Sequence, residues 1–124
     1  MLVVSTKLNK SPINGIGLFA TNVIKQNTVV ARVHPKFDRI FSEKEVEEMD
    51  DLQKEFIKIY AVKQRNWYIV SLDNERFMNH SENNNISSIN GKLIANRDIF
   101  PEEEIICNYN EICEIGIDFE INKE

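Results

Sequence analysis

Cysteine, glycine and proline are scarce in this chain. Its 124 residues include 2 cysteines, 4 glycines, 3 prolines and 2 histidines. So few cysteines, without a CxxC pair, exclude a disulfide-rich scaffold and predict no structural metal site. Two reduced thiols are the expected state, and one disulfide between Cys107 and Cys113 is the alternative.

Long apolar runs are also missing. No stretch approaches the roughly 18 consecutive apolar residues of a membrane-spanning helix. The first residues lack the basic flank and apolar stretch of a secretory signal. We therefore expect no membrane partner and a cytoplasmic or nuclear location.

Negative charge exceeds positive charge, with a formal net charge of -5. Acidic residues gather at 43–55 and 111–124. Such a surface repels phosphate backbones, so direct binding of nucleic acid is not expected. It would attract a basic protein or peptide at long range. A solvated face that only keeps the protein soluble is the alternative.

The pattern along the chain indicates one domain with many short strands. A tight hairpin turn is expected at Asn90-Gly91, because Asn-Gly suits a two-residue turn between alternating apolar residues. Short β-type segments are expected at residues 2–8, 18–33, 67–72, 87–95 and 104–109. With one clear helix, this predicts an irregular, β-dominated α+β domain.

The expected helix follows a capping-box pattern. Ser42 and Glu45 have the spacing at which each side chain satisfies a backbone N–H of the first turn. An apolar stripe follows at helical spacing and is predicted to face the core. Its members are Val46, Met49, Leu52, Phe56 and Ile59.

A glycine motif near the start, Gly15-x-Gly17-x-x-Ala20, matches the dinucleotide-binding fingerprint. That motif needs a helix beginning at the glycines to hold a pyrophosphate. Residues 21–33 are rich in β-branched side chains and have no helical period. The motif therefore does not predict a Rossmann site here.

Three motifs occur together in a characteristic order. They are Gly15-x-Gly17-x-Phe19-Ala20, then Arg76-Phe77-Met78-Asn79-His80-Ser81 with Asn85, then Glu103-Glu104-Ile105-x-x-Asn108-Tyr109. Together they resemble the SET-domain family of protein-lysine methyltransferases, over residues 3 to 110. The chain is most similar to the minimal, stand-alone viral or bacterial type, which lacks a zinc-binding post-SET module.

The resemblance implies a SET-domain fold: several small sheets, a C-terminal pseudo-knot and one main helix in an insert. A single domain over residues 1–124 is expected, with 111–124 closing the substrate channel. It also implies S-adenosyl-L-methionine as the methyl donor. The donor is expected to contact Asn79, His80 and Tyr109, together with backbone of Ile16, Gly17 and Leu18.

Tyr109 is the predicted catalytic residue. The resemblance places its hydroxyl at the floor of a narrow channel, where it would orient a neutral lysine amine toward the methyl group. Cys107 and Phe119 are predicted to line this channel. Because cysteine is smaller than the phenylalanine or tyrosine often found at such a position, room for di- or trimethylation is expected.

Several positions depart from the family pattern. Glu102 stands at a usual glycine, so its turn must avoid positive φ or tolerate strain. Residues 32–35 lack a tyrosine that many members place in the channel wall, and Tyr60, Tyr68 or Phe119 are the candidates to replace it. Glu103 and Glu104 are interpreted as structural or exposed.

The predicted function is methyl transfer to the lysine ε-amine of a protein, with a histone or another basic protein as the expected substrate. A catalytically impaired SET domain that binds the cofactor or a protein is the alternative. A chain this short would also gain buried surface by forming a homodimer.

Overall fold

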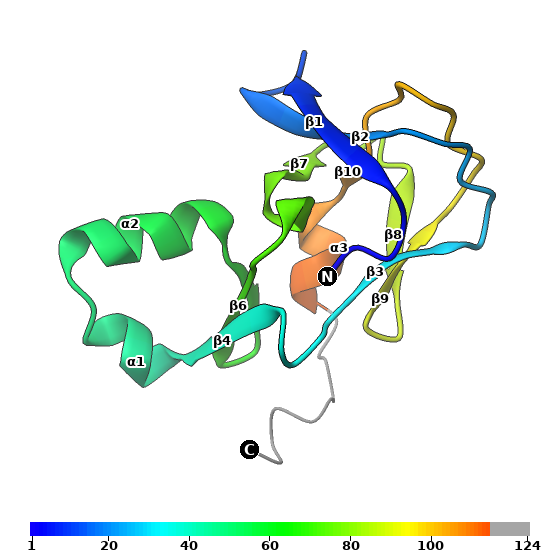
Figure 1. The fold of residues 1–124 in the computed structure, drawn as a ribbon. Helices are drawn as coiled ribbons and strands as arrows, with labels where there is room; N and C mark the ends of the chain where they lie inside the picture. Colours follow the sequence, from blue (N-terminus) through cyan, green and yellow to red (C-terminus); the bar gives the residue numbers. More distant parts are fainter. Residues whose placement is uncertain (115–124) are drawn as a thin grey trace.

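The computed structural model describes residues 1–114. It contains ten short strands within that range, three α-helices and one 3-10 helix, η1 (Figure 1). In chain order the elements are β1 (Thr6–Lys10), β2 (Ile16–Ala20), β3 (Val29–Arg32), β4 (Asp38–Ser42), α1 (Glu43–Glu47), α2 (Asp51–Tyr60), β5 (Val62–Gln64), β6 (Trp67–Ser71), η1 (Asn74–Phe77), β7 (Asn79–His80), β8 (Ile86–Ile89), β9 (Lys92–Ala95), β10 (Ile106–Cys107) and α3 (Tyr109–Glu114). Within residues 1–114, no helix is long and apolar enough to cross a membrane.

The strands form four small sheets. Two are antiparallel and three-stranded, with the orders β3-β9-β8 and β4-β6-β5. β1 and β2 form an antiparallel pair, whereas β7 and β10 form a parallel pair. This confirms the predicted β-dominated α+β class, with small sheets in place of one large sheet.

The hairpin between β8 and β9 turns where the sequence predicts it. Asn90 and Gly91 have φ angles of 50° and 76°. Two consecutive positive φ angles are typical of the type I′ turn, whose twist matches that of the flanking strands. Glu102 also has a positive φ, 72°, so the turn at this usual glycine position tolerates strain.

The expected single helix of the insert is interrupted and forms two helices. The capping box of Ser42 and Glu45 is confirmed at the start of α1. A second capping box, between Asp50 and Gln53, starts α2. The Asp50 backbone is extended, so the chain breaks there and begins a new helix. We call residues 43–60, which hold both helices, the insert arm.

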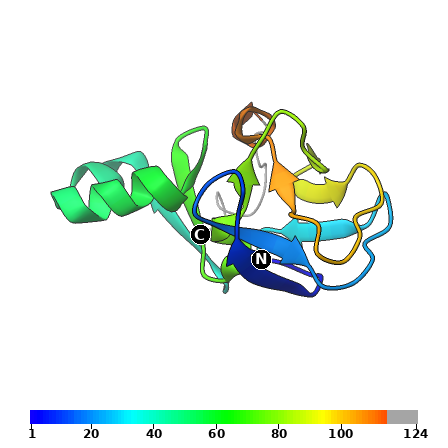
Figure 2. The ribbon, with the colours of Figure 1, turned by 90° about the horizontal axis from the view of Figure 1, so that it is seen from above.

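The apolar stripe of the insert arm does not face the core. Leu52, Phe56 and Ile59 are 78%, 46% and 62% exposed. Ile57 is the residue of α2 that is buried. The prediction of a core-facing stripe was wrong because the arm projects away from the body of the domain, as both views show (Figures 1 and 2). Its outer side therefore has no layer to pack on within residues 1–114.

The core lies between β2, the β3-β9-β8 sheet and β10. Its buried members are mostly aliphatic and come from both halves of the chain: Leu18, Ala20, Ile24, Val30, Met78, Ile86, Ala95, Ile99, Ile105 and Cys107. Two members, Ile105 and Cys107, belong to the segment that precedes α3. The core therefore depends on residues near the end of the described chain.

The segment 104–107 passes between β2 and the loop 81–85. On one side, Ile105 N–H donates to the carbonyl of Leu18 (2.7 Å), and on the other, Asn85 N–H donates to the carbonyl of Ile106 (3.1 Å). The buried Asn85 side chain also donates to the carbonyl of Glu104 (2.8 Å) and accepts from Ile106 N–H (2.8 Å). This arrangement agrees with the predicted C-terminal pseudo-knot.

Candidate active site

Tyr109 lies beside the strand β7, as the family resemblance requires. Its backbone N–H donates to Nδ1 of His80 (3.0 Å), and its hydroxyl donates to the carbonyl of Met78 (2.8 Å). The rings of His80 and Tyr109 are 5.0 Å apart. The residue is therefore fixed at both ends to the segment 78–80.

The strand expected over 104–109 is shorter than predicted, and Tyr109 begins α3. The Asn108 side chain accepts from Asn110 N–H (3.0 Å), and its carbonyl accepts from Glu111 N–H (3.1 Å). An asparagine that accepts in this way favours the start of a helix over an extended strand. The resulting turn brings the phenol back toward Met78.

The pKa of Tyr109 is raised from 10.0 to about 12, by burial and by its proximity to Cys107. Burial disfavours the charged phenolate. The phenol is therefore protonated throughout the neutral range. It can donate to Met78 while its oxygen lone pairs remain able to accept a hydrogen bond.

His80 is half-buried next to this tyrosine. Because its Nδ1 accepts a hydrogen bond from Tyr109 N–H, the ring proton of the neutral imidazole is on Nε2. His80 therefore helps to hold the start of α3 through its side chain. Its predicted contact with a cofactor stays a prediction.

Asn79 is buried and central to a polar network. Its amide nitrogen donates to Glu104 Oε2 (2.9 Å) and to the carbonyls of Asn14 (3.1 Å) and Ile16 (3.4 Å). Ser11 donates its hydroxyl to both Glu104 oxygens (2.7 and 2.9 Å). The two donor hydrogens of Asn79 are thus used within the protein. Sequence reasoning assigned Glu104 a structural or exposed role, and it is buried and structural.

Gly17 lies against the same carboxylate. A Cβ added to it would be 2.9 Å from Glu104 Cδ and closer still to Glu104 Oε2, and 3.0 Å from Ser11 Cβ. Because the carboxylate is held by Ser11 and Asn79, it cannot move aside cheaply. Gly17 is therefore required by close approach within the protein.

The other two residues of the predicted cofactor stretch differ in exposure. Ile16 is exposed, whereas Leu18 is fully buried in the core. The carbonyl of Leu18 is also engaged by Ile105 N–H. Ile16 and the turn that precedes it are therefore exposed to solvent, whereas Gly17 and Leu18 are buried.

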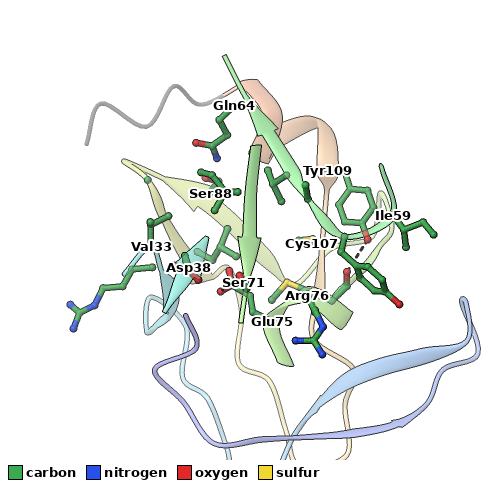
Figure 3. Close-up of a pocket in the computed structure, with 18 of the residues that line it drawn as sticks. Val33, Asp38, Ile59, Gln64, Ser71, Glu75, Arg76, Ser88, Cys107 and Tyr109 are labelled. Atoms are coloured by element: carbon green, nitrogen blue, oxygen red, sulfur yellow. Dashed lines mark hydrogen bonds between the residues drawn. The ribbon is translucent and has the colours of Figure 1, made fainter. Parts of the chain in front are cut away.

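A pocket of about 190 Å³ opens next to Tyr109 and Cys107 (Figure 3). Figure 3 shows Tyr109 and Ile59 on one side of it and Val33 and Asp38 on the opposite side. Much of its wall is apolar or aromatic and comes from three of the four sheets and from α2, including Tyr60, Val62, Ile69, Met78 and Leu93. Such a lining suits the aliphatic stem of a lysine.

The structure separates the predicted site residues into two groups. Cys107 and Tyr109 line the pocket. Asn79 and His80 lie beside Tyr109 but do not line the pocket. Residues 16–18 join this second group, because the Asn79 side chain donates to the carbonyl of Ile16. Of the three aromatic candidates, Tyr60 lines the pocket and Tyr68 does not. Phe119 lies outside the described residues.

Sequence reasoning missed the carboxylates of the pocket. Asp38 and Glu75 line it, and the amine of Met1 lies 3.2 Å from Asp38 Oδ2 and 2.6 Å from Glu75 Oε2. Burial lowers the pKa of this amine, but attraction from Glu75 and Asp38 outweighs burial and raises it. Burial also raises the pKa of Glu75. Sequence spacing gives no signal for a cluster drawn from positions 1, 38 and 75.

Solved structures share this architecture. The crystal structure of a "putative histone methyltransferase" from Plasmodium falciparum matches with a TM-score of 0.61 and 22% identity, over 86% of this chain and 93% of that one. A humanized mutant of the Chaetomium thermophilum Polycomb Repressive Complex 2, bound to the inhibitor GSK126, matches with a TM-score of 0.66 and 21% identity, over 90% of this chain and 16% of that one. At these identities the likeness is evidence for the fold.

No curated protein sequence matches this chain significantly. The family model of the SET domain matches residues 15–110. That range includes all three motifs, from the glycine pair through the Asn79-His80 strand to Tyr109. The chain belongs to the SET domain family.

Proposed function

We propose that this protein transfers a methyl group from S-adenosyl-L-methionine to the ε-amine of a lysine in a protein substrate. One observation carries the proposal: the Tyr109 phenol is fixed in the wall of a largely apolar pocket, directly beside the strand that carries Asn79 and His80. The pocket fits the lysine stem, and the strand is where the family motif predicts the methyl donor.

The residues at the junction of the two groups fit a sulfonium cofactor. Two oxygen atoms meet there, the Tyr109 hydroxyl and the Met78 carbonyl that accepts its hydrogen bond (2.8 Å), and the next carbonyl along the chain, of Asn79, lies 3.6 Å from the Cys107 thiol. Such oxygens suit a cationic centre with polarised methyl groups, through C–H···O contacts. When bound, the cofactor would supply an electrophilic methyl group.

The chain's own residues would hold the cofactor and the amine in line. The exposed turn at Gly15 and Ile16 and the backbone of Asn79 and His80 are the proposed cofactor contacts. Because the Asn79 amide nitrogen is occupied by Glu104, we propose that Asn79 acts through its backbone and by fixing the turn.

Tyr109 would position the amine without removing its proton. A phenol with a pKa of about 12 is a poor base at neutral pH when its proton is held by Met78. Free lysine has a pKa of about 10.4, and the apolar part of the wall and the adjacent positive sulfonium would lower it by disfavouring the ammonium. The carboxylates of Asp38 and Glu75, which would favour the ammonium, are already paired with the Met1 amine. The neutral amine could then donate to the phenol oxygen, and alignment would supply much of the rate.

The proposed substrate is a basic protein such as a histone. The support is the acidic surface of the insert arm, which would attract a lysine-rich segment. Cys107 at the pocket wall is small, so we propose that more than one methyl group can be accommodated.

The test combines binding and transfer. S-adenosyl-L-methionine is titrated calorimetrically, and transfer of labelled methyl groups to a mixture of basic proteins is then measured for wild type, Tyr109→Phe and Tyr68→Phe. Tyr68 is the matched control because it does not line the pocket. We expect binding in all three and loss of transfer in Tyr109→Phe alone.

Two outcomes would change the assignment. Cofactor binding without transfer by the wild type would favour the impaired binding module over the enzyme. Absence of cofactor binding would exclude both the enzyme and the cofactor-binding module. Equal transfer by Tyr109→Phe and wild type would refute the role of the phenol.

A further inference from the structure

Glu104 is a buried carboxylate without a cationic partner in residues 1–114. Only 9% of its surface is exposed, and the ion pairs found among these residues use other carboxylates. Its hydrogen bonds come from neutral donors, the Ser11 hydroxyl and the Asn79 amide. Since both groups donate, they suit an ionised carboxylate, which only accepts. Buried charges are ordinarily paired, so this one retains a negative charge that the described part of the chain does not neutralise.

The Glu104 charge lies directly beside the proposed cofactor contacts. The Asn79 amide nitrogen that donates to Glu104 also donates to the carbonyls of Asn14 and Ile16, which flank the glycine of the proposed cofactor turn. A Cβ added to Gly17 would overlap Glu104 Oε2, so only a hydrogen atom separates the glycine Cα from the carboxylate. Because the carboxylate is buried at such close range, solvent and salt screen it little, and its field reaches the turn at 14–16.

The proposed methyl donor and its product differ by one positive charge. S-adenosyl-L-methionine has an ammonium, a carboxylate and a sulfonium, so one positive charge is left uncancelled. During transfer, the bond between sulfur and the methyl carbon breaks with its electron pair left on sulfur, and the lysine nitrogen forms the new bond with its lone pair. The positive charge thus passes to the lysine, and the product S-adenosyl-L-homocysteine is a thioether without net charge. A fixed negative charge nearby therefore attracts the donor more strongly than the product.

We propose that Glu104 is a specificity-determining residue, which makes the cofactor site prefer the methyl donor to the demethylated product. The inference rests on the proposed function, since it takes the turn at 14–16 and the strand β7 as the cofactor site. At an effective dielectric constant of about 20, two unit charges roughly 10 Å apart change a binding constant by about tenfold. A preference of this size favours exchange of the spent cofactor for fresh donor after each transfer.

Four forms of the full chain separate the effect of the charge from that of the network: wild type, Glu104→Gln, Ser11→Ala and Glu102→Gln. In Glu104→Gln the amide oxygen can accept from Asn79 and the amide nitrogen can donate to Ser11, so the network is retained without its charge. Ser11→Ala does the reverse, since it removes a hydrogen-bond donor and leaves the charge. Glu102→Gln removes one charge from an exposed side chain two residues away. Circular dichroism verifies that each variant is folded.

Isothermal calorimetry measures Kd for the donor and for the product with each form, and labelled methyl transfer is measured alongside. We expect wild type to bind the donor about tenfold more tightly than the product, and Glu104→Gln to bind the two about equally. Ser11→Ala and Glu102→Gln should retain the wild-type ratio. Because the Glu104 charge is buried, the ratio should also persist from about 0.1 M to about 1 M salt, whereas a preference due to surface charge would decline.

Equal binding of donor and product by wild type would overturn the inference, and so would a ratio that Glu104→Gln leaves unchanged. An equal loss of the ratio in Ser11→Ala would also overturn it, because the network and not the charge would then be responsible. If Glu104→Gln does not fold, the wild-type ratio and its dependence on salt still decide between these outcomes. Equal binding with methyl transfer intact leaves the proposed function standing, whereas absence of binding by both cofactors contradicts the proposed function as well as this inference.

Discussion

Substituting Gly17 with alanine tests the buried network that joins the glycine turn to the Asn79 strand. The new methyl group would overlap the Glu104 carboxylate, which accepts hydrogen bonds from Ser11 and Asn79. To relieve this overlap, the Glu104 carboxylate must give up at least one of these hydrogen bonds. A hydrogen bond to a charged group contributes about 1.5–3 kcal/mol, and overpacking costs about 1–3 kcal/mol. We expect Gly17→Ala to lower the free energy of unfolding by the sum of the two, about 2.5–6 kcal/mol.

A second substitution tests whether overlap with the Glu104 carboxylate causes the destabilisation. Glu104→Asp withdraws the carboxylate by one methylene group and makes room for the methyl. We therefore expect the double variant to be less destabilised than the sum of the single variants by about 1 kcal/mol or more. Gly15→Ala is the matched control. Its Cβ would meet nothing within 4 Å, so it reports the strain of φ +48° alone and should not couple to Glu104→Asp.

Urea unfolding followed by fluorescence of the single tryptophan, Trp67, measures each variant. Additive effects of Gly17→Ala and Glu104→Asp would refute the steric explanation. So would a loss below about 0.5 kcal/mol for Gly17→Ala, since surface substitutions commonly fall in that range.

Four further predictions concern the pocket. Tyr109→Phe should lower kcat by about 10²-fold or more, and absorbance should show a wild-type phenol ionising near pH 12 that the variant lacks. The pKa of Tyr109 in the folded protein exceeds the unfolded value of about 10, so the contribution of the protonated phenol to stability is complete below pH 10 and is lost as pH rises toward 12. Urea denaturation at several pH values will measure this loss. Cys107→Phe should narrow the pocket and restrict mass-spectrometric products to the monomethyl form, whereas wild type yields di- or trimethyl lysine; strictly monomethyl wild-type product would contradict this. Tyr60→Ala should raise KM while Tyr68→Ala does not, and equal effects would exclude Tyr60 as the wall aromatic.

Local signals in the sequence predicted local structure well. The Asn90-Gly91 turn and the Ser42 capping box were confirmed because each depends on residues within a few positions of one another. The break in the insert was also available locally, since Asp50 and Gln53 have the spacing of a second capping box. It was missed because the apolar period continues across it.

Burial was harder to predict than secondary structure. The stripe on α2 has the period of a core-facing helix, but period alone does not reveal whether a neighbouring layer exists. Glu104 shows the opposite case, in which a charged residue is buried because Ser11 and Asn79 reach it from distant parts of the chain. The Met1, Asp38 and Glu75 cluster has the same origin.

The juxtaposition of Tyr109 with Asn79 and His80 was predicted through the family motifs and not through periodicity. A parallel pair of two-residue strands, β7 and β10, is too short to leave a pattern. The motif order nevertheless placed Tyr109 beside Asn79 and His80, as found. The role of Phe119 stays a prediction.

The passage of residues 104–107 between β2 and the loop 81–85 sets the time at which this domain matures during synthesis. A nascent chain that ends before residue 104 has made Leu18 and Ile86 but not Ile105, which completes their core. Contacts this distant in sequence form slowly. Synthesis must therefore pass residue 107 before the domain can bury its apolar interior, and until then the exposed apolar side chains favour aggregation.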